Sequence, residues 1–293
     1  MRIVLLVNET SGRGRAAALA DACEPALRAV GAEVVRLPVT VADGALAQQA
    51  RGAAAVVAVG GDGTVRSTAQ RILPLGVPMA VAPAGTENLV ARAFGFRVPP
   101  AALAAAIASG ATRRIDVAML RRRGMPDHLF LAMLSAGFDA EVVARVQAAR
   151  TGAITHATYL GPIVGTLRTW RAPMVRLCAS QAPKKPLAEG TGMLVVANAP
   201  RYAMGLDPAP GANAQDGLLD AVFIPARGGV DVARWLLRRT LGRPPTPAVQ
   251  ARAFRVQVDP PAALQADGDP VPGGVSGEFE VLALPEALAL VAV

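Results

Sequence analysis

Short apolar runs alternate with helical patterns through the first third of the chain. Short, mainly apolar runs predict strands at 3–7, 34–37, 54–59 and 79–82. The apolar spacing and the stop signals between these runs predict helices over about 15–30, 43–51, 64–73 and 87–94. Strands that alternate with helices typically form a parallel sheet covered on both faces. We therefore predict an α/β domain over residues 1–114.

The pattern changes after about residue 113. Strand-like runs now follow one another, at 115–120, 130–135, 174–180, 193–198, 219–224 and 254–258. Helical patterns remain only at 140–149 and 230–239, and the Pro/Gly-rich stretch 270–277 is expected to be a loop or a hairpin. This arrangement favours an antiparallel β-sandwich with insertions over residues 115–281.

Composition limits the classes of protein that fit this pattern. A length of 293 residues favours two domains, and 52% hydrophobic with 18% charged residues indicates packed globular structure. Two cysteines form no disulfide framework. The apolar N-terminal run is interpreted as a strand rather than a signal peptide, and the uncharged stretch 151–167 contains Pro162 and three glycines, which disfavours a membrane span. We expect a cytoplasmic protein, peripheral at the inner membrane face.

The net charge of +8 favours anionic partners. With 4% aromatic residues, the chain lacks the basic and aromatic interleaving of single-stranded nucleic-acid binders, so no nucleic-acid partner is expected. Trp170, between Arg168 and Arg171, suits an interfacial anchor at a lipid surface, although a half-buried aromatic is the commoner case. The oligomeric state stays open, a homodimer included.

The strongest chemical signal is the run Gly60-Gly61-Asp62-Gly63-Thr64, directly after the third predicted strand. Ligands of open parallel sheets bind at the carboxyl ends of strands, and glycines let backbone amides approach phosphate oxygens closely. The dipole of the following helix adds to this attraction. A tight turn in which the glycines only relieve steric crowding is the competing interpretation. We favour a phosphate-binding loop.

Two further loops occupy equivalent positions. Pro83 to Asn88 follows the fourth predicted strand, and Thr86 there is either a helix cap or a nucleotide contact. The loop from Asn8 to Arg15 fits the dinucleotide fingerprint weakly, because no acidic residue follows the second strand, which runs into Thr40. We interpret it as a third phosphate-facing loop. No Walker loop occurs anywhere in the chain.

Late in the chain, Asp267-Gly268-Asp269 places two carboxylates beside a glycine. One of them is suited to accept a proton from an attacking hydroxyl, while a simple Asp-Gly hairpin turn is at least equally plausible on spacing alone. Asp216-Gly217 is similar, with a turn as the default and a metal-binding loop as the alternative.

Taken in order, these motifs resemble the catalytic family of diacylglycerol kinases, which includes bacterial lipid kinases and the sphingosine and ceramide kinases. Further matching blocks are Ile115-Asp116-Val117, Gly137-Phe138-Asp139-Ala140, Asn198, Tyr202 and Gly205. The resemblance implies an ATP- and Mg²⁺-dependent enzyme acting on a lipid hydroxyl at a membrane surface. It also implies that the tail 282–293 returns to the first domain.

The resemblance carries roles for individual residues. Asp269 becomes the candidate general base, Asp267 its catalytic neighbour, and Asp62 the organiser of phosphate and metal. A structural Mg²⁺ is implied at Asp216, with backbone oxygens near Asn213 and Leu218. The predicted nucleotide-binding residues are Asn8, Ser11, Gly12, Arg13, Arg15, Thr40, Gly60, Gly61, Asp62, Gly63, Thr64, Gly85, Thr86 and Asn88.

Two alternatives remain. NAD kinases share the Gly-Gly-Asp-Gly motif, but their later Gly-Ser-Thr-Ala-Tyr block is not found here. A non-catalytic nucleotide- or lipid-binding protein is the other, because Ser67 and Leu89 stand where the family usually has acids. Retained nucleotide binding without turnover would identify it. The lipid itself (diacylglycerol, ceramide, a sphingoid base or phosphatidylglycerol) is not readable from the sequence.

Overall fold

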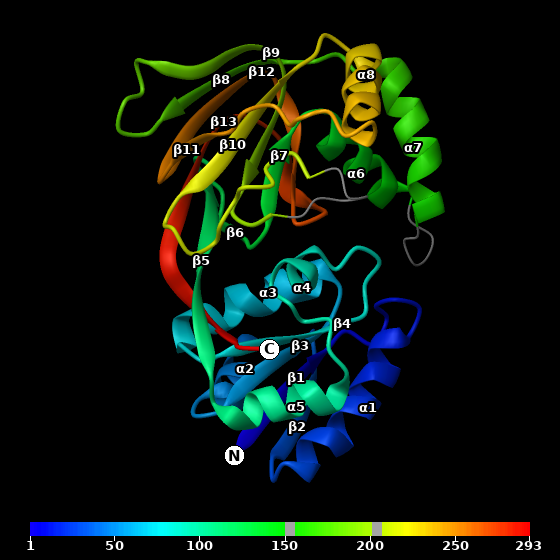
Figure 1. The fold of residues 1–293 in the computed structure, drawn as a ribbon, viewed down its shortest axis with the longest axis vertical. Coiled ribbons are helices and arrows are strands. Elements are labelled where there is room, and N and C mark those ends of the chain that lie inside the picture. Colours follow the sequence, from blue (N-terminus) through cyan, green and yellow to red (C-terminus); the bar gives the residue numbers. More distant parts are fainter. Residues whose placement is uncertain (150–155, 201–206) are drawn as a thin grey trace. The chain divides into compact units, whose positions relative to one another are not determined.

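A computed structural model describes residues 1–149, 156–200 and 207–293. The chain divides into two compact units, Met1–Ile115 with Glu286–Val293, and Asp116–Pro285. Two long strands, β5 (Thr112–Arg121) and β13 (Asp269–Val291), have residues in both units. Figure 1 shows the course of the chain.

The first unit is built on a parallel sheet with the strand order β2-β1-β3-β4. Its strands are β1 (Arg2–Val7), β2 (Glu33–Pro38), β3 (Ala55–Gly60) and β4 (Met79–Pro83). The last residues of β13 extend the sheet, since Leu290 pairs in parallel with Met79. Every residue of β3 is buried, as expected for a strand covered on both faces.

The helices of this unit are α1 (Arg15–Ala29), α2 (Asp43–Ala50), α3 (Asp62–Ile72), the short 3-10 helix η1 (Leu73–Leu75), α4 (Leu89–Ala93) and α5 (Pro100–Ser109). α1 packs on α5 and the sheet, whereas α3 packs on β3, β4, α2 and α4. The chain leaves β1 towards β2 on one side and later returns to β3 on the other. The carboxyl ends of β1 and β3 therefore flank a topological switch point, where ligands of such sheets bind.

Three details differ from the sequence predictions here. α3 begins at Asp62, two residues earlier than predicted, because Gly61 is extended and the helix starts directly after it. α4 begins at Leu89, after Asn88 adopts a left-handed conformation with φ 51°. α5 was not predicted, although its Pro100 at the first position and Gly110 after the end are typical helix boundaries. Because this helix is rich in alanine, its sequence shows no helical periodicity of polar and apolar residues.

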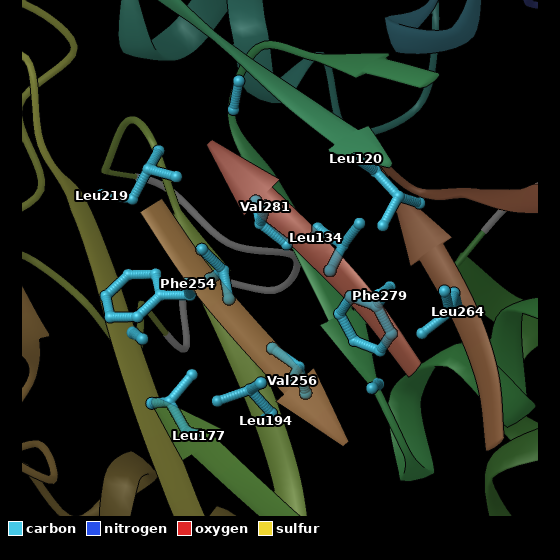
Figure 2. Packing of buried hydrophobic residues seen from close by; sticks show 14 of the residues in the cluster. Leu120, Leu134, Leu177, Leu194, Leu219, Phe254, Val256, Leu264, Phe279 and Val281 are labelled. Carbon is cyan, nitrogen blue, oxygen red and sulfur yellow. The ribbon is translucent and has the colours of Figure 1, made fainter. Parts of the chain in front are cut away.

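The second unit is antiparallel, as predicted. Besides parts of β5 and β13, its strands are β6 (His128–Phe130), β7 (Met133–Ala136), β8 (Met174–Ala179), β9 (Pro186–Ala197), β10 (Leu219–Pro225), β11 (Val249–Ala251) and β12 (Ala253–Ala266). Their order is β11-β10-β9-β7-β12-β13, with β8 pairing both β9 and β12. Figure 2 shows inward side chains of these strands, among them Leu194, Phe254 and Phe279, meeting in one apolar core.

Helices α6 (Phe138–Ala148), α7 (His156–Thr169) and α8 (Gly229–Thr240) complete this unit. α6 packs on β12 and α7, and α7 packs on α8. α7 was not predicted from the sequence, because its glycines and Pro162 obscure the helical pattern. Within the described ranges, no helix is long and apolar enough to cross a membrane.

The stretch 270–277 was predicted to be a loop or a hairpin, and the structure shows the hairpin. It is part of strand β13, which pairs antiparallel with β12. Register shifts between Gln257 and Ala262 and between Ala263 and Gln265 interrupt this ladder. Irregular pairing of this kind tolerates proline and glycine, which a regular central strand would not.

Candidate functional site

Three loops of the first unit converge at the carboxyl edge of its sheet. The loop after β4 joins the loop after β3 because Ala84 N–H donates to the Gly60 carbonyl at 2.8 Å. The loop after β1 joins the same place through Arg15, whose guanidinium donates to the Gly85 carbonyl at 3.4 Å. The structure therefore brings together the three loops that the sequence picked out separately.

Glycine is required where these loops touch. Gly12 has φ +62°, and a Cβ built on it would lie 2.0 Å from the Ala84 carbonyl oxygen. A Cβ on Gly85 would lie 2.7 Å from the Cα of Gly61. Backbone therefore packs directly on backbone, and no side chain fits between these loops.

Asn8 and Thr64 form a polar contact beneath the loops. The Asn8 side-chain amide donates to Thr64 Oγ1 at 3.1 Å, and Thr10 donates to Asn8 Oδ1 at 2.9 Å. Thr64 is buried, and a Cβ on Gly60 would lie 2.5 Å from its hydroxyl oxygen. These two predicted nucleotide-binding residues thus hold β1 and α3 together.

Asp62 connects the starts of two helices, and Asn88 closes the loop that leads into the second of them. Asp62 Oδ1 accepts a hydrogen bond from Val90 N–H at 3.0 Å, which ties the first turn of α3 to that of α4. Asn88 Oδ1 accepts from Gly85 N–H at 2.8 Å, and its amide donates back to the Gly85 carbonyl at 3.0 Å. Both residues shape the loops, and their predicted contacts with phosphate or metal stay predictions.

The remaining predicted nucleotide residues lie around the same edge. Ser11 is half-buried, Arg13 is exposed with φ 60°, and Gly63 lies in the first turn of α3 with Thr64. Thr40 is exposed in the turn after β2, the strand at the end of the sheet order. The start of α3, together with Arg13 and Arg15, gives this edge the chemistry of an anion-binding site, because the dipole of a helix favours negative charge at its N-terminus.

In the second unit, Asp267-Gly268 forms the turn of a β-hairpin. Ala266 pairs with Asp269 across it, and both central residues have positive φ, 49° at Asp267 and 86° at Gly268. This is the geometry of a two-residue type I′ turn, which Asp-Gly favours. The turn interpretation left open by the sequence is therefore what the chain adopts. Asp269 follows as the half-buried first residue of β13.

The Asp267 carboxylate is fixed in place. Its side chain is 2% exposed and accepts hydrogen bonds from the backbone N–H groups of Leu131, Ala132 and Met133 at 2.7, 2.8 and 3.0 Å. Gly268 N–H donates to the Gln265 side-chain oxygen at 2.9 Å. These bonds give Asp267 a positioning function for the turn that carries Asp269. Its catalytic assignment stays a prediction.

A second buried acid holds the loop with the predicted metal residues. Asp116 is fully buried, and its carboxylate accepts a hydrogen bond from Gly217 N–H at 2.7 Å. Asp216 is exposed, and its Oδ1 accepts from Leu218 N–H at 2.9 Å. Asn213 is exposed in the same loop. The predicted metal residues Asn213 and Asp216 therefore lie exposed in one loop, whose Gly217 is held by the buried Asp116.

Asp220 adds an electrostatic reason for a cation near this loop. It is 4% exposed, Gln250 donates to its Oδ1 at 3.1 Å, and its Oδ2 has no hydrogen-bond partner. Burial raises the pKa of the Asp220 carboxyl, the Gln250 bond opposes this, and the charge of Asp216 adds to the rise. A bound cation would relieve this repulsion.

Oxygen donors of this kind suit Mg²⁺ or Ca²⁺. Among the residues that the structure describes, no group of three or more His, Cys, Asp or Glu side chains gathers at one point. The predicted metal set consists of the Asp216 carboxylate with backbone oxygens near Asn213 and Leu218, and metal binding there stays a prediction.

Several structurally important polar residues were not selected as site residues from the sequence. Asp116, Asn198 and Gln265 are all buried, and Asn198 donates from its amide to the carbonyls of Asp116 and Leu131 at 3.0 and 2.8 Å. The available signal was a polar residue inside an otherwise apolar run. Tyr202 and Gly205, which the family resemblance also used, lie outside the described residues.

The fold and the site define a two-unit class of protein, an α/β unit whose glycine loops meet at a topological switch point, followed by an antiparallel β-sandwich. Comparison with known proteins specifies the family. Residues 2–120 match the sequence model of the diacylglycerol kinase catalytic domain, and residues 132–292 match that of the YegS C-terminal NAD kinase beta sandwich-like domain. The chain belongs to the diacylglycerol kinase family of lipid kinases.

Individual relatives agree with this assignment. A Mycobacterium tuberculosis protein named Diacylglycerol kinase is 29% identical over 75% of this chain and 72% of its own length. A Pseudomonas fluorescens protein named Probable lipid kinase YegS-like is 30% identical over 76% of this chain and 73% of its own length. A crystal structure of a diacylglycerol kinase from Bacillus anthracis superposes with a TM-score of 0.69 at 17% identity, covering 100% and 97% of the two chains. That structural likeness shows the fold.

Proposed function

We propose that this protein transfers the γ-phosphoryl group of ATP to the hydroxyl of a diacylglycerol-like lipid. The meeting of three glycine loops at the switch point of a parallel sheet carries the proposal, because it brings loop backbone together beside the N-terminus of α3, where phosphate groups are favoured. Phosphoryl transfer depends mainly on positioning and charge neutralisation. Loops fixed to one another by backbone contacts are suited to positioning.

Asp269 is the proposed general base. A positioned carboxylate accepts the proton of the attacking lipid hydroxyl, and its placement depends on the turn that precedes it. Asp267 holds that turn by accepting hydrogen bonds from three backbone N–H groups, so Asp269 directly follows a turn that is fixed in place. Mg²⁺ bound with ATP would neutralise charge on the phosphates, with Asp62 as the proposed organiser at the start of α3.

The acceptor is proposed from the relatives. The Mycobacterium tuberculosis protein bears the name Diacylglycerol kinase, and the Pseudomonas proteins are named as lipid kinases. We therefore place diacylglycerol first among the acceptors. Ceramide, sphingoid bases and phosphatidylglycerol also offer a hydroxyl beside acyl or alkyl chains.

The test is incubation of the purified protein with labelled ATP, Mg²⁺ and a panel of these lipids, with NAD as a further acceptor. Asp269→Asn keeps the size of the side chain and removes the base, so we expect turnover to fall by about a hundredfold or more while ATP binding is retained. Glu189→Gln, an exposed neutralisation on β9, is the matched control. Undiminished turnover in Asp269→Asn would contradict the base assignment, and labelled NAD in place of lipid would contradict the lipid assignment.

A further inference from the structure

Exposed apolar side chains gather on two neighbouring helices of the second unit. Five of the twelve large hydrophobic residues that are exposed in the described part of the chain lie on α7, on α8 or at the end of α8. They are Leu160 and Val164 on α7, and Val230, Leu237 and Leu241 on or after α8, with exposed fractions from 44% to 70%. Apolar groups concentrated in this way mark an interaction surface more often than scattered ones do.

The spacing places these residues in a single stripe on each helix. Leu160, Val164 and Arg168 follow one another at four-residue steps on α7. On α8, Val230, Leu237 and Leu241 are seven and four residues apart. Residues three, four and seven apart share one face of a helix. We refer to these two stripes together as the α7–α8 face.

The opposite side of each helix is packed. Thr166 on α7 is fully buried, and Val232 on α8 is 1% exposed. The helices touch closely, since a Cβ on Gly229 would lie 1.8 Å from the Leu167 carbonyl oxygen. Figure 1 shows α7 and α8 side by side. The exposed stripes therefore point away from the body of the unit.

The charge on this face is positive. Helix α7 contains no acidic residue, and α8 contains only Asp231, whose carboxylate accepts from Arg227 N–H at 2.9 Å and pairs with Arg234 at 3.4 Å. Arg168 and Arg238 are exposed beside the apolar stripes. Leucine and valine bordered by arginine are typical of helices that lie in the interface of an anionic membrane.

We propose that the α7–α8 face docks on a bilayer that contains anionic phospholipids, which brings the kinase to its lipid substrate. The inference extends the proposed function by naming the surface that meets the membrane. A second copy of the chain fits less well, because a two-fold contact would set the arginines of one face against those of the other. Anionic headgroups would instead neutralise them.

Trp170 is not part of this surface. It was considered from the sequence as an interfacial anchor, but it is 8% exposed and packs edge-on against Phe138, with ring centroids 5.6 Å apart. The interpretation of Trp170 as an interfacial anchor is therefore wrong. In the proposed docking surface, exposed aliphatic residues of the flanking helices have that function instead. The family alone does not select these residues; their exposure and spacing do.

The experiment measures co-sedimentation of the purified protein with vesicles of phosphatidylcholine alone or mixed with phosphatidylglycerol. We expect binding to the mixed vesicles, weakened by added salt, and about tenfold or more loss in Leu237→Glu/Leu241→Glu and in Arg168→Glu/Arg238→Glu. Leu187→Glu, an exposed leucine on β9, and Lys184→Glu/Lys185→Glu are matched controls that should bind like the parent. Circular dichroism and thermal unfolding confirm that each variant is folded.

Failure of this inference is separable from failure of the proposed function. Phosphorylation of a water-dispersed short-chain diacylglycerol should be unchanged in the α7–α8 variants, whereas phosphorylation of long-chain diacylglycerol in mixed vesicles should fall. Parent-like vesicle binding by both double variants would overturn the docking surface. So would loss of a dimer by light scattering without loss of vesicle binding. Vesicle binding without any lipid phosphorylation would overturn the proposed function and leave the docking surface standing.

Discussion

The two regions with candidate chemistry hold their backbones in place in opposite ways. At the carboxyl edge of the first unit, glycines remove side chains so that Gly12 and Gly85 let neighbouring loops touch. At the hairpin of the second unit, the buried carboxylate of Asp267 gathers three backbone N–H groups. The glycine loops depend on the absence of side chains, whereas the hairpin depends on a buried, hydrogen-bonded charge. A substitution in the loops should therefore act through steric overlap, and a substitution in the hairpin through the loss of hydrogen bonds.

The largest expected effect is at Asp267. Replacement by alanine leaves three buried N–H groups without their acceptor, and we expect the free energy of unfolding to fall by about 3 kcal/mol or more. Thermal and denaturant unfolding measure this loss. Asp259→Ala, at an exposed position on β12, is the control. A melting temperature equal to that of the control would show that the hairpin is not held by Asp267.

Substitution of Gly12 tests whether the loops need the absence of a side chain, and Gly14 in the same loop is the control. Gly12 and Gly14 both have positive φ, but only Gly12 has a neighbour within 4 Å of an added Cβ. Gly12→Ala should displace the loop and weaken ATP binding about tenfold or more, since the obstacle is backbone. Gly14→Ala should show only the smaller backbone cost, about 1 kcal/mol in stability. Titration calorimetry with an ATP analogue compares them, and equal affinities would refute the loop-packing argument.

Asp220 and Asp267 are both buried acids that differ in their hydrogen bonds. Both carboxylate oxygens of Asp267 accept hydrogen bonds, whereas one oxygen of Asp220 has no partner. Burial holds the pKa of Asp220 above that of the unfolded chain. The folded state then binds more protons, so this group lowers stability as pH rises above the unfolded pKa, near 3.9. In the absence of divalent cations, the melting temperature of Asp220→Asn relative to the parent should therefore increase from pH 4 to pH 7.

The matching measurement adds Mg²⁺ at pH 7. If the loop of Asp216 holds a cation, Mg²⁺ should raise the melting temperature of the parent more than that of Asp216→Asn. An equal rise in the two proteins would remove the metal assignment at Asn213, Asp216 and Leu218. A pH-independent difference between the parent and Asp220→Asn would contradict the raised pKa.

The sequence was sufficient for features that depend on near neighbours. The four parallel strands of the first unit were predicted within about two residues, because each is a mainly apolar run followed by a turn signal. The loops after β1, β3 and β4 were also identified, since parallel strands end at one edge of a sheet. The family followed from the same motifs. α7 and α5 escaped because glycine, proline and repeated alanine obscure helical periodicity.

What only the tertiary structure decided was the environment of each polar or aromatic residue. Asp267 meets partners 134 to 136 residues away, so its burial cannot be read from the residues beside it. Trp170 is buried and packs against Phe138, while Leu160 and Leu237 stay exposed. Short-range patterns specify helices, strands and turns because those form between near neighbours. Burial, charge pairing and exposed faces are set by contacts between distant segments, which exist only once the chain has folded.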